Sequence, residues 1–186
     1  MHVETLSSLQ DQPIRSDNAR HRQRGASLLE GIAYLGIAAI VVVGAISLLT
    51  GAFGSAKANQ ATEEVIGLRT AVRKLYLGQP YPTTGIVATL VAAKAVPGTL
   101  SVNPATSALT NSWRGDVSIG SAPTGFTITY PAVPKEVCVG ILSGANGWTS
   151  IAVNGDTALD VFPVTAATAT GQCTGIIDNV IVFTST

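Results

Sequence analysis

Residues 20–58 read RHRQRGASLLEGIAYLGIAAIVVVGAISLLTGAFGSAKA and predict the fold of this 186-residue chain. No charged residue occurs between Gly31 and Ala56, and a basic cluster ending at Arg24 precedes this apolar run. One carboxylate, Glu30, stands at the leading edge of the run. An acidic residue costs roughly 2.5–3.5 kcal/mol at the centre of a membrane helix and less near the interface, so an acid here is by default functional and needs a partner.

The composition excludes most catalytic chemistry. Charged residues make up 12% of the chain and the formal net charge is zero, so the sequence predicts neither disorder nor a nucleic-acid surface. Both histidines, His2 and His21, precede Gly25, which excludes Ser-His-Asp, Cys-His and histidine–metal sites in everything that follows. No nucleotide-binding or G-x-S-x-G motif is present. We therefore expect no enzyme, no catalytic residue and no cofactor.

Two general interpretations of the N-terminal region remain open. Residues 1–25 are polar and predict no stable structure. An ordinary signal peptide cut near Ala56-Lys57-Ala58 would leave a secreted binding domain, but the uncharged run far exceeds the usual hydrophobic region of roughly 7–15 residues. An uncleaved single-pass anchor is compatible with the length of the run. Under either interpretation the arginines keep the N-terminus in the cytoplasm.

The third interpretation is more specific. The sequence RGASLLE at residues 24–30, followed by an apolar helix, resembles the class III signal of type IV pilins. The resemblance implies that a prepilin peptidase cuts between Gly25 and Ala26, removes residues 1–25 as a leader, and methylates the new N-terminus at Ala26. The long leader and a first mature residue other than phenylalanine resemble the type IVb branch. The residues implied in assembly are Ala26, Leu28, Leu29 and Glu30, with Glu30 of one subunit paired to the Ala26 amine of its neighbour.

The helix is expected to continue well beyond a membrane span, because no proline occurs between Ala26 and Leu77. Residues 26–56 form the transmembrane or filament-core half in this prediction, and residues 57–186 the globular domain. In the second half, apolar residues recur every three or four positions, which is typical of an amphipathic helix: Ala58, Ala61, Val65, Leu68, Val72 and Leu75. The charged residues, Glu63 and Glu64 among them, are expected mostly off this stripe. A coiled coil is disfavoured because the stripe ends at Gly78 and Pro80.

The remaining sequence predicts an α+β fold, with an antiparallel sheet packed on the helix stripe. We expect helices at residues 86–96 and 134–142, strands at 116–119, 126–130, 148–153 and 180–183, and loops at 99–115 and 165–171. The only cysteines, Cys138 and Cys173, fall in a region placed outside the cytoplasm, where a disulfide is the expected outcome. Type IV pilins close their C-terminal region with such a bond, which here implies a D-region at residues 138–173.

No metal site is predicted. Asp156, Asp160 and Asp178 offer carboxylates of the kind that bind calcium, but no loop pattern supports a site. They are interpreted as solvated loop acids.

Residues 111–113 and 130–138 resemble pilins of the bundle-forming type and of the thin pili of conjugative plasmids. The resemblance implies the major subunit of a type IVb pilus, which polymerises with itself for adhesion, aggregation or mating contact. It implies an inner-membrane precursor with a cytoplasmic N-terminus and a periplasmic globular domain, then an extracellular filament. Implied partners are the prepilin peptidase, an inner-membrane assembly platform with its ATPase, and an outer-membrane secretin. A type II secretion pseudopilin and a minor pilin remain alternatives.

Overall fold

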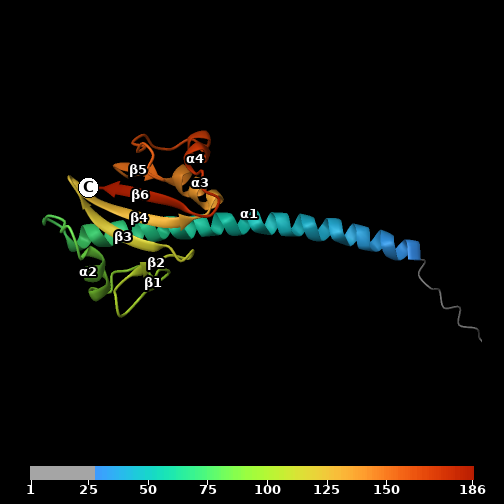
Figure 1. Cartoon of the computed structure of the whole chain (residues 1–186), viewed down its shortest axis with the longest axis horizontal. Helices are drawn as coiled ribbons and strands as arrows, with labels where there is room; N and C mark the ends of the chain where they lie inside the picture. The colour runs from blue at the N-terminus through green and yellow to red at the C-terminus, as the bar shows by residue number, and fades with distance from the viewer. Residues whose placement is uncertain (1–27) are drawn as a thin grey trace, which may run out of the picture. The chain divides into compact units, whose positions relative to one another are not determined.

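Residues 28–186 are described by a computed structural model. The predicted leader, the cleavage between Gly25 and Ala26, and the methylation of Ala26 lie outside the described residues. The chain divides into two compact units, Met1–Val43 and Gly44–Thr186, and the second is called the globular unit below. Helix α1, Leu28–Leu75, begins in the first unit and ends in the second (Figure 1). The described residues of the first unit are all helical.

An antiparallel sheet forms the centre of the globular unit. Its six strands lie in the order β1-β2-β3-β4-β6-β5. Val182 of β6 pairs with Thr129 of β4 on one side and with Ala152 of β5 on the other. The strands are β1 (Ser101–Val102), β2 (Leu109–Thr110), β3 (Asp116–Ala122), β4 (Gly125–Val133), β5 (Ser150–Val153) and β6 (Asn179–Ser185). The remaining helices are α2 (Ile86–Ala92), α3 (Lys135–Gly144) and α4 (Ala166–Gln172).

The core lies between the sheet and the apolar stripe of α1. Five of the six predicted stripe residues are buried and Leu75 is partly buried. Alternate residues of the central strands fill the other side, because side chains along a strand point to opposite faces: Ile128 and Tyr130 of β4, and Ile181 and Phe183 of β6. Fully burying a side chain such as Leu68 stabilises the fold by about 1.5–3 kcal/mol. The predicted α+β fold is confirmed.

Two predicted loops contain regular structure. Residues 165–171, expected as a loop, include α4, in which the Thr165 hydroxyl caps the helix by accepting from the Thr168 N–H at 3.2 Å. This helix shows no clear apolar period because Ala169 is its only buried residue. Residues 99–115, also expected as a loop, contain the two-residue strands β1 and β2, which are too short to show a period.

Helix α2 ends at Ala92 rather than at residue 96. Lys94 adopts a left-handed conformation with φ 52°, the Ala95 N–H donates to the Leu90 carbonyl, and the Lys94 N–H donates to the Val91 carbonyl. This pair of bonds is the Schellman motif, which usually contains glycine at the left-handed position. A lysine there gave no stop signal, so the helix was predicted too long.

The charged residues of this helix half lie mostly off the apolar stripe, as predicted, but Glu64 is an exception: its side chain is 1% exposed. Its two carboxylate oxygens accept hydrogen bonds from the Tyr130 hydroxyl and, at 2.9 Å, from Gln60 Nε2. A buried carboxylate is tolerated when its lone pairs are satisfied in this way. Burial, and then the hydrogen bond to Glu64, raise the pKa of the Tyr130 phenol above its ordinary range. The pair links α1 to β4 across the core.

Tyr130→Phe is expected to lower the free energy of unfolding at neutral pH by about 1–3 kcal/mol, because Glu64 loses a buried donor. The variant should also lose less of its free energy of unfolding than the wild type does when the pH is raised. The raised pKa keeps the Tyr130 phenol neutral in the folded protein. The contribution of this phenol to the free energy of unfolding is therefore complete below the pKa of an unfolded tyrosine, about 10. Above that pH the contribution falls by about 1.4 kcal/mol per pH unit. Urea unfolding of the globular unit at neutral and strongly alkaline pH measures both effects. Tyr76→Phe, which alters a half-buried tyrosine outside this hydrogen bond, is the matched control. Equal alkaline losses in the wild type and Tyr130→Phe would contradict the prediction.

Candidate assembly surface

The N-terminal half of α1 carries exposed apolar side chains around its whole circumference. Large residues at successive positions are more than half exposed, for example Val41, Val42 and Val43. Successive helix residues are rotated by about 100°, so such a run covers every side of the helix. By length and composition, α1 is the one helix among the described residues that could cross a membrane. This surface suits a lipid environment or other apolar helices, and not water.

The glycines of this half have no structural reason within the described chain. At Gly31, Gly36, Gly44 and Gly51, no heavy atom beyond the adjacent residues and the nearby helix backbone lies within 4 Å of the position that a Cβ would take. Each glycine weakens a helix by about 1 kcal/mol relative to alanine. Small residues on apolar helices allow neighbouring helices to approach closely. The glycines therefore fit a surface that packs against other helices.

Glu30 lies in the first turn of α1, together with Leu28 and Leu29. Both leucines are exposed, at 86% and 78%, and so is Glu30. A carboxylate in the first turn of a helix is favoured by the helix dipole. The structure thus brings three of the four predicted assembly residues together. The fourth, Ala26, lies outside the described residues.

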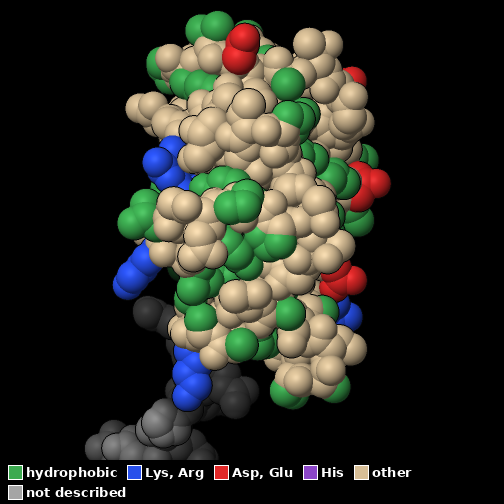
Figure 2. Space-filling model, turned by 90° about the vertical axis from the view of Figure 1, so that its left-hand side faces the viewer, with side chains coloured by type: hydrophobic (Ala, Val, Ile, Leu, Met, Phe, Trp, Pro, Cys, Tyr) green, Lys and Arg blue, Asp and Glu red, His purple; other side chains and the backbone are tan. Residues whose placement is uncertain are grey.

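Two stretches of the globular unit each carry charges of one sign. Residues 65–115 contain five basic residues and no acid, whereas residues 137–186 contain three acids and no base. Figure 2 shows Lys and Arg side chains gathered mainly along one edge, and Asp and Glu side chains at the top and along the opposite edge. Asp156, Asp160 and Asp178 are all exposed, and the described residues hold no cluster of three or more potential metal ligands. The three acids are therefore exposed residues outside helices and strands, as the sequence predicts.

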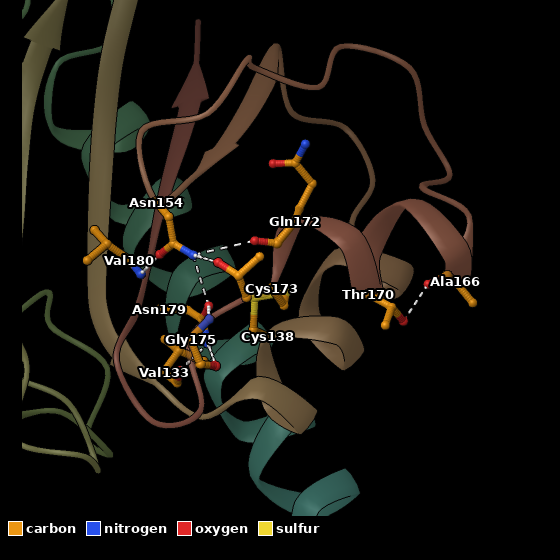
Figure 3. The surroundings of a disulfide bond; sticks show 11 residues. Val133, Cys138, Asn154, Ala166, Thr170, Gln172, Cys173, Gly175, Asn179 and Val180 are labelled. Atoms are coloured by element: carbon orange, nitrogen blue, oxygen red, sulfur yellow. Dashed lines mark hydrogen bonds between the residues drawn. A yellow bond between two sulfur atoms is a disulfide. The ribbon is translucent and has the colours of Figure 1, made fainter.

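A disulfide closes the C-terminal part of the globular unit. Cys138 of α3 bonds to Cys173, which follows α4, with their Cα atoms 6.0 Å apart (Figure 3). Both cysteines are fully buried. The bond links α3 to the end of α4, and the chain between the two helices contains β5. The predicted pairing is therefore present in the structure.

A buried asparagine holds the loop that follows the disulfide. Asn179 Nδ2 donates to the carbonyls of Val133 and Gly175, at 2.9 and 2.7 Å, while Asn179 Oδ1 accepts from the Gly175 N–H at 2.8 Å and from Asn154 Nδ2 at 3.0 Å (Figure 3). This network fixes both ends of residues 175–178. Sequence reasoning missed it, although one signal was available: Asn179 is in phase with the core residues Ile181 and Phe183 of β6.

A second polar group ties α1 to the sheet. The Arg69 guanidinium lies 4.8 Å from the centre of the Trp148 ring, and Arg69 Nε donates to Ser185 Oγ at 3.0 Å. Burial, and then the charge of Arg73, lower the pKa of Arg69. Cation–π contacts of this kind contribute about 0.5–2 kcal/mol. Like Glu64 and Tyr130, the residues Arg69, Trp148 and Ser185 stabilise the fold. The surfaces that remain for binding are the exposed ones.

Comparison with known proteins gives concordant matches. The PilS family model, described as PilS N terminal, matches residues 55–186. The major structural subunit of bundle-forming pilus from Escherichia coli O127:H6 is 27% identical over 171 residues, which cover 81% of this chain and 88% of that protein. The corresponding subunit from Escherichia coli O111:H- is 26% identical over the same coverage. A crystal structure of a type IVb pilin from Salmonella typhi is 31% identical, with a TM-score of 0.54, and covers 67% of this chain and 95% of that one.

Proposed function

Because this chain belongs to the PilS family of type IV pilins, we propose that it is the major structural subunit of a type IVb pilus. The observation that carries this proposal is the first half of α1, which exposes apolar side chains on every side. Such a surface needs apolar partners along its whole length. In a homopolymer, the same helix of neighbouring subunits supplies them. The relatives named as major subunits of the bundle-forming pilus support the same role.

Before assembly the subunit is held in the inner membrane by this helix. The uncharged residues 31–56 extend about 39 Å as a helix at 1.5 Å per residue, more than the bilayer core of about 30 Å requires. The basic cluster at residues 20–24 places the N-terminus in the cytoplasm and the globular part in the periplasm. Assembly moves the apolar helix from lipid to a bundle of identical helices, and the pilus is then extracellular.

Processing defines the mature chain. A prepilin peptidase removes the leader, residues 1–25, by cutting between Gly25 and Ala26, and methylates the Ala26 amine. The mature subunit then consists of residues 26–56, which span the membrane or line the filament core, and residues 57–186, which form the globular domain with its D-region at 138–173. An inner-membrane platform with its ATPase and an outer-membrane secretin complete the pathway.

Glu30 pairs with the Ala26 amine of a neighbouring subunit and sets the axial register. Four helical residues separate the two positions, a rise of about 6 Å. In a core without water, a lone carboxylate and a lone ammonium each carry a large desolvation cost, which pairing offsets. Such a pair specifies the alignment of two helices more than it adds net stability. Leu28 and Leu29 pack beside it.

The other interpretations are less well supported. The relatives that match are pilus major subunits, which favours a major subunit over a type II secretion pseudopilin or a minor pilin. A secreted binding domain with an ordinary signal peptide does not account for the glycines and Glu30 in the exposed apolar helix. The filament serves adhesion, aggregation or mating contact in this proposal.

Intact mass and N-terminal sequencing of material sheared from the cell surface test the proposal. We expect a chain that begins at methylated Ala26 and lacks two hydrogens because Cys138 and Cys173 are oxidised. A chain that begins at Lys57 or Asn59, recovered as a soluble protein, would overturn the proposal and indicate an ordinary signal peptide. Reduction with dithiothreitol is the control, because it adds back the two hydrogens and leaves the N-terminus unchanged.

A further inference from the structure

A short loop between the disulfide and β6 exposes two large apolar side chains. In residues 175–178, called the isoleucine loop below, Ile176 is 80% exposed and Ile177 is 70% exposed. The Asn179 side chain bonds the backbone at the start of this loop, and the Ile176 carbonyl accepts from the Lys135 N–H at 3.0 Å. Apolar side chains exposed on a fixed loop are typical of a binding surface, because a pre-organised loop loses little entropy on binding.

The isoleucine loop lies at the end of the globular unit where α1 leaves the sheet. The loop is bonded to the first residue of α3, and that end of α3 also meets α1. A Cβ added at Gly54 of α1 would lie 3.2 Å from Glu136 Oε2, in the first turn of α3. Figure 1 shows that β6 starts at this end of the sheet. The isoleucine loop and Gly54 therefore flank the same end of α3.

Two hydrogen bonds between α1 and the sheet give the same direction. Ser185, at the end of β6, bonds Arg69 of α1. Four residues earlier in β6, Ile181 pairs with Tyr130, whose hydroxyl bonds Glu64. Moving back along β6 thus moves back along α1, toward its exposed apolar half. The isoleucine loop precedes β6 and lies further in this direction.

This level of α1 coincides with the edge of the bilayer in the proposed membrane anchor. A hydrocarbon core of about 30 Å takes about 20 helical residues, so counting from Gly31 places its periplasmic boundary near Gly51. The headgroup region adds about 5–7 Å, and Gly54, about 4.5 Å further along the helix, falls within it. Phe53 is 61% exposed here, and Lys57 is the first charged residue that follows. The isoleucine loop is therefore at the depth of the lipid headgroups.

We propose that the isoleucine loop contacts the periplasmic face of the inner membrane before assembly, with Ile176 and Ile177 inserted at the boundary between headgroups and acyl chains. Apolar side chains next to a membrane helix are buried most readily at this boundary. Two exposed bases, Lys57 and Lys135, and two exposed acids, Glu136 and Asp178, occur beside the loop or its contact with α1, so the contact does not require anionic lipid. The inference rests on the membrane anchor of the proposed function, and it adds a second lipid contact that assembly must release.

Lipid quenching of a fluorescent label tests the contact in vesicles that contain the full chain at high dilution. A nitrobenzoxadiazole label on Ile177→Cys should be quenched at least about twofold by lipids with a nitroxide at a shallow acyl position. Leu77→Cys is the matched control. Leu77 is 83% exposed but follows the C-terminal end of α1, about 30 Å of helix from Gly54, and its label should not be quenched.

A label on Val42→Cys reports on the anchor itself and should be quenched by a nitroxide deeper in the bilayer. Quenching at Val42 without quenching at Ile177 would overturn the inference and leave the proposed function intact. If the label at Val42 is not quenched, the membrane anchor fails, and the proposed function and the inference fail together. The two failures are thus distinguishable.

The reaction of the same cysteines with a polymer-linked maleimide avoids an apolar label. Relative to its rate in urea, Ile177→Cys should react at least about fivefold more slowly than Leu77→Cys in vesicles, because lipid covers it. Adding Ile176→Asp to Ile177→Cys should bring the two rates to within about twofold, since a charge at this boundary disfavours insertion. Adding Val161→Asp instead, at a similarly exposed residue of a different loop, should leave the reaction slow.

Two results of the maleimide reaction would overturn the inference. Equal rates at Ile177→Cys and Leu77→Cys would show that the isoleucine loop is in water. Protection of Ile177→Cys that disappears on further dilution with lipid would indicate a contact between copies of the chain instead. Each variant is counted as folded when Cys138 and Cys173 remain oxidised and do not react with the maleimide.

Discussion

Glu30→Leu is expected to leave the subunit processed and in the membrane, but to lower the amount of filament about a hundredfold. Removing one partner of a buried ion pair costs about 3–5 kcal/mol, because the other charge is left unpaired, and about 3 kcal/mol corresponds to a factor of a hundred. In the proposed pairing, the charge left behind is the Ala26 amine of the neighbouring subunit. Quantitative immunoblotting of sheared filament and of membrane fractions measures the two pools.

The membrane pool should not fall, since leucine at a helix position in lipid is more favourable than glutamate. The variant thus separates storage from assembly, which a general defect in folding would not do. Thr83→Leu is the control, because it also replaces an exposed polar side chain by leucine, but in the loop after α1 and outside the apolar helix half. It should assemble normally. Filament at the wild-type amount from Glu30→Leu would show that the pairing is not needed for assembly.

The helix and the sheet could be predicted because their apolar residues recur at the regular spacing of a helix or a strand. The stripe from Ala58 to Val72 repeats every three or four positions, and each of its members is buried. Residues 126–130 likewise alternate apolar residues with threonine, and Phe126, Ile128 and Tyr130 are buried. Such patterns depend only on local geometry, with 3.6 residues per helical turn and two per strand repeat.

Polar residues that act through distant partners could not be predicted in this way. Glu64 is buried because Tyr130, 66 positions away, supplies a donor, and Asn179 is buried because its amide bonds the Val133 carbonyl, 46 positions away. A charge or an amide in a sequence gives no sign of such a partner. The exposure of Ile176 and Ile177 was also missed, since apolar residues next to a strand resemble the strand itself. Glu30 is the exception, because an acid in an uncharged run is conspicuous without any structure.

Removing the disulfide is the second large effect, expected to lower the free energy of unfolding of the globular unit by about 3–4 kcal/mol. Cys138 and Cys173 are 35 positions apart, and closing a loop of that length restricts the unfolded chain. The folded state is affected too, because both sulfurs are buried between α3 and α4. Urea unfolding of the double variant Cys138→Ala with Cys173→Ala, compared with the wild type, measures the difference.

The midpoint should fall by about 1–4 M urea, given a dependence of about 1–3 kcal/mol per molar for a unit of this size. Dithiothreitol should shift the wild type toward the variant and leave the variant unchanged, which isolates the bond from the loss of two side chains. Val161→Ala, which shortens an exposed side chain between the two cysteines, is the matched control and should unfold as the wild type does. Equal midpoints for the wild type and the double variant would mean that the bond adds nothing to global stability. Its role would then be confined to the loop after Cys173, where Asn179 fixes the same backbone from the opposite side.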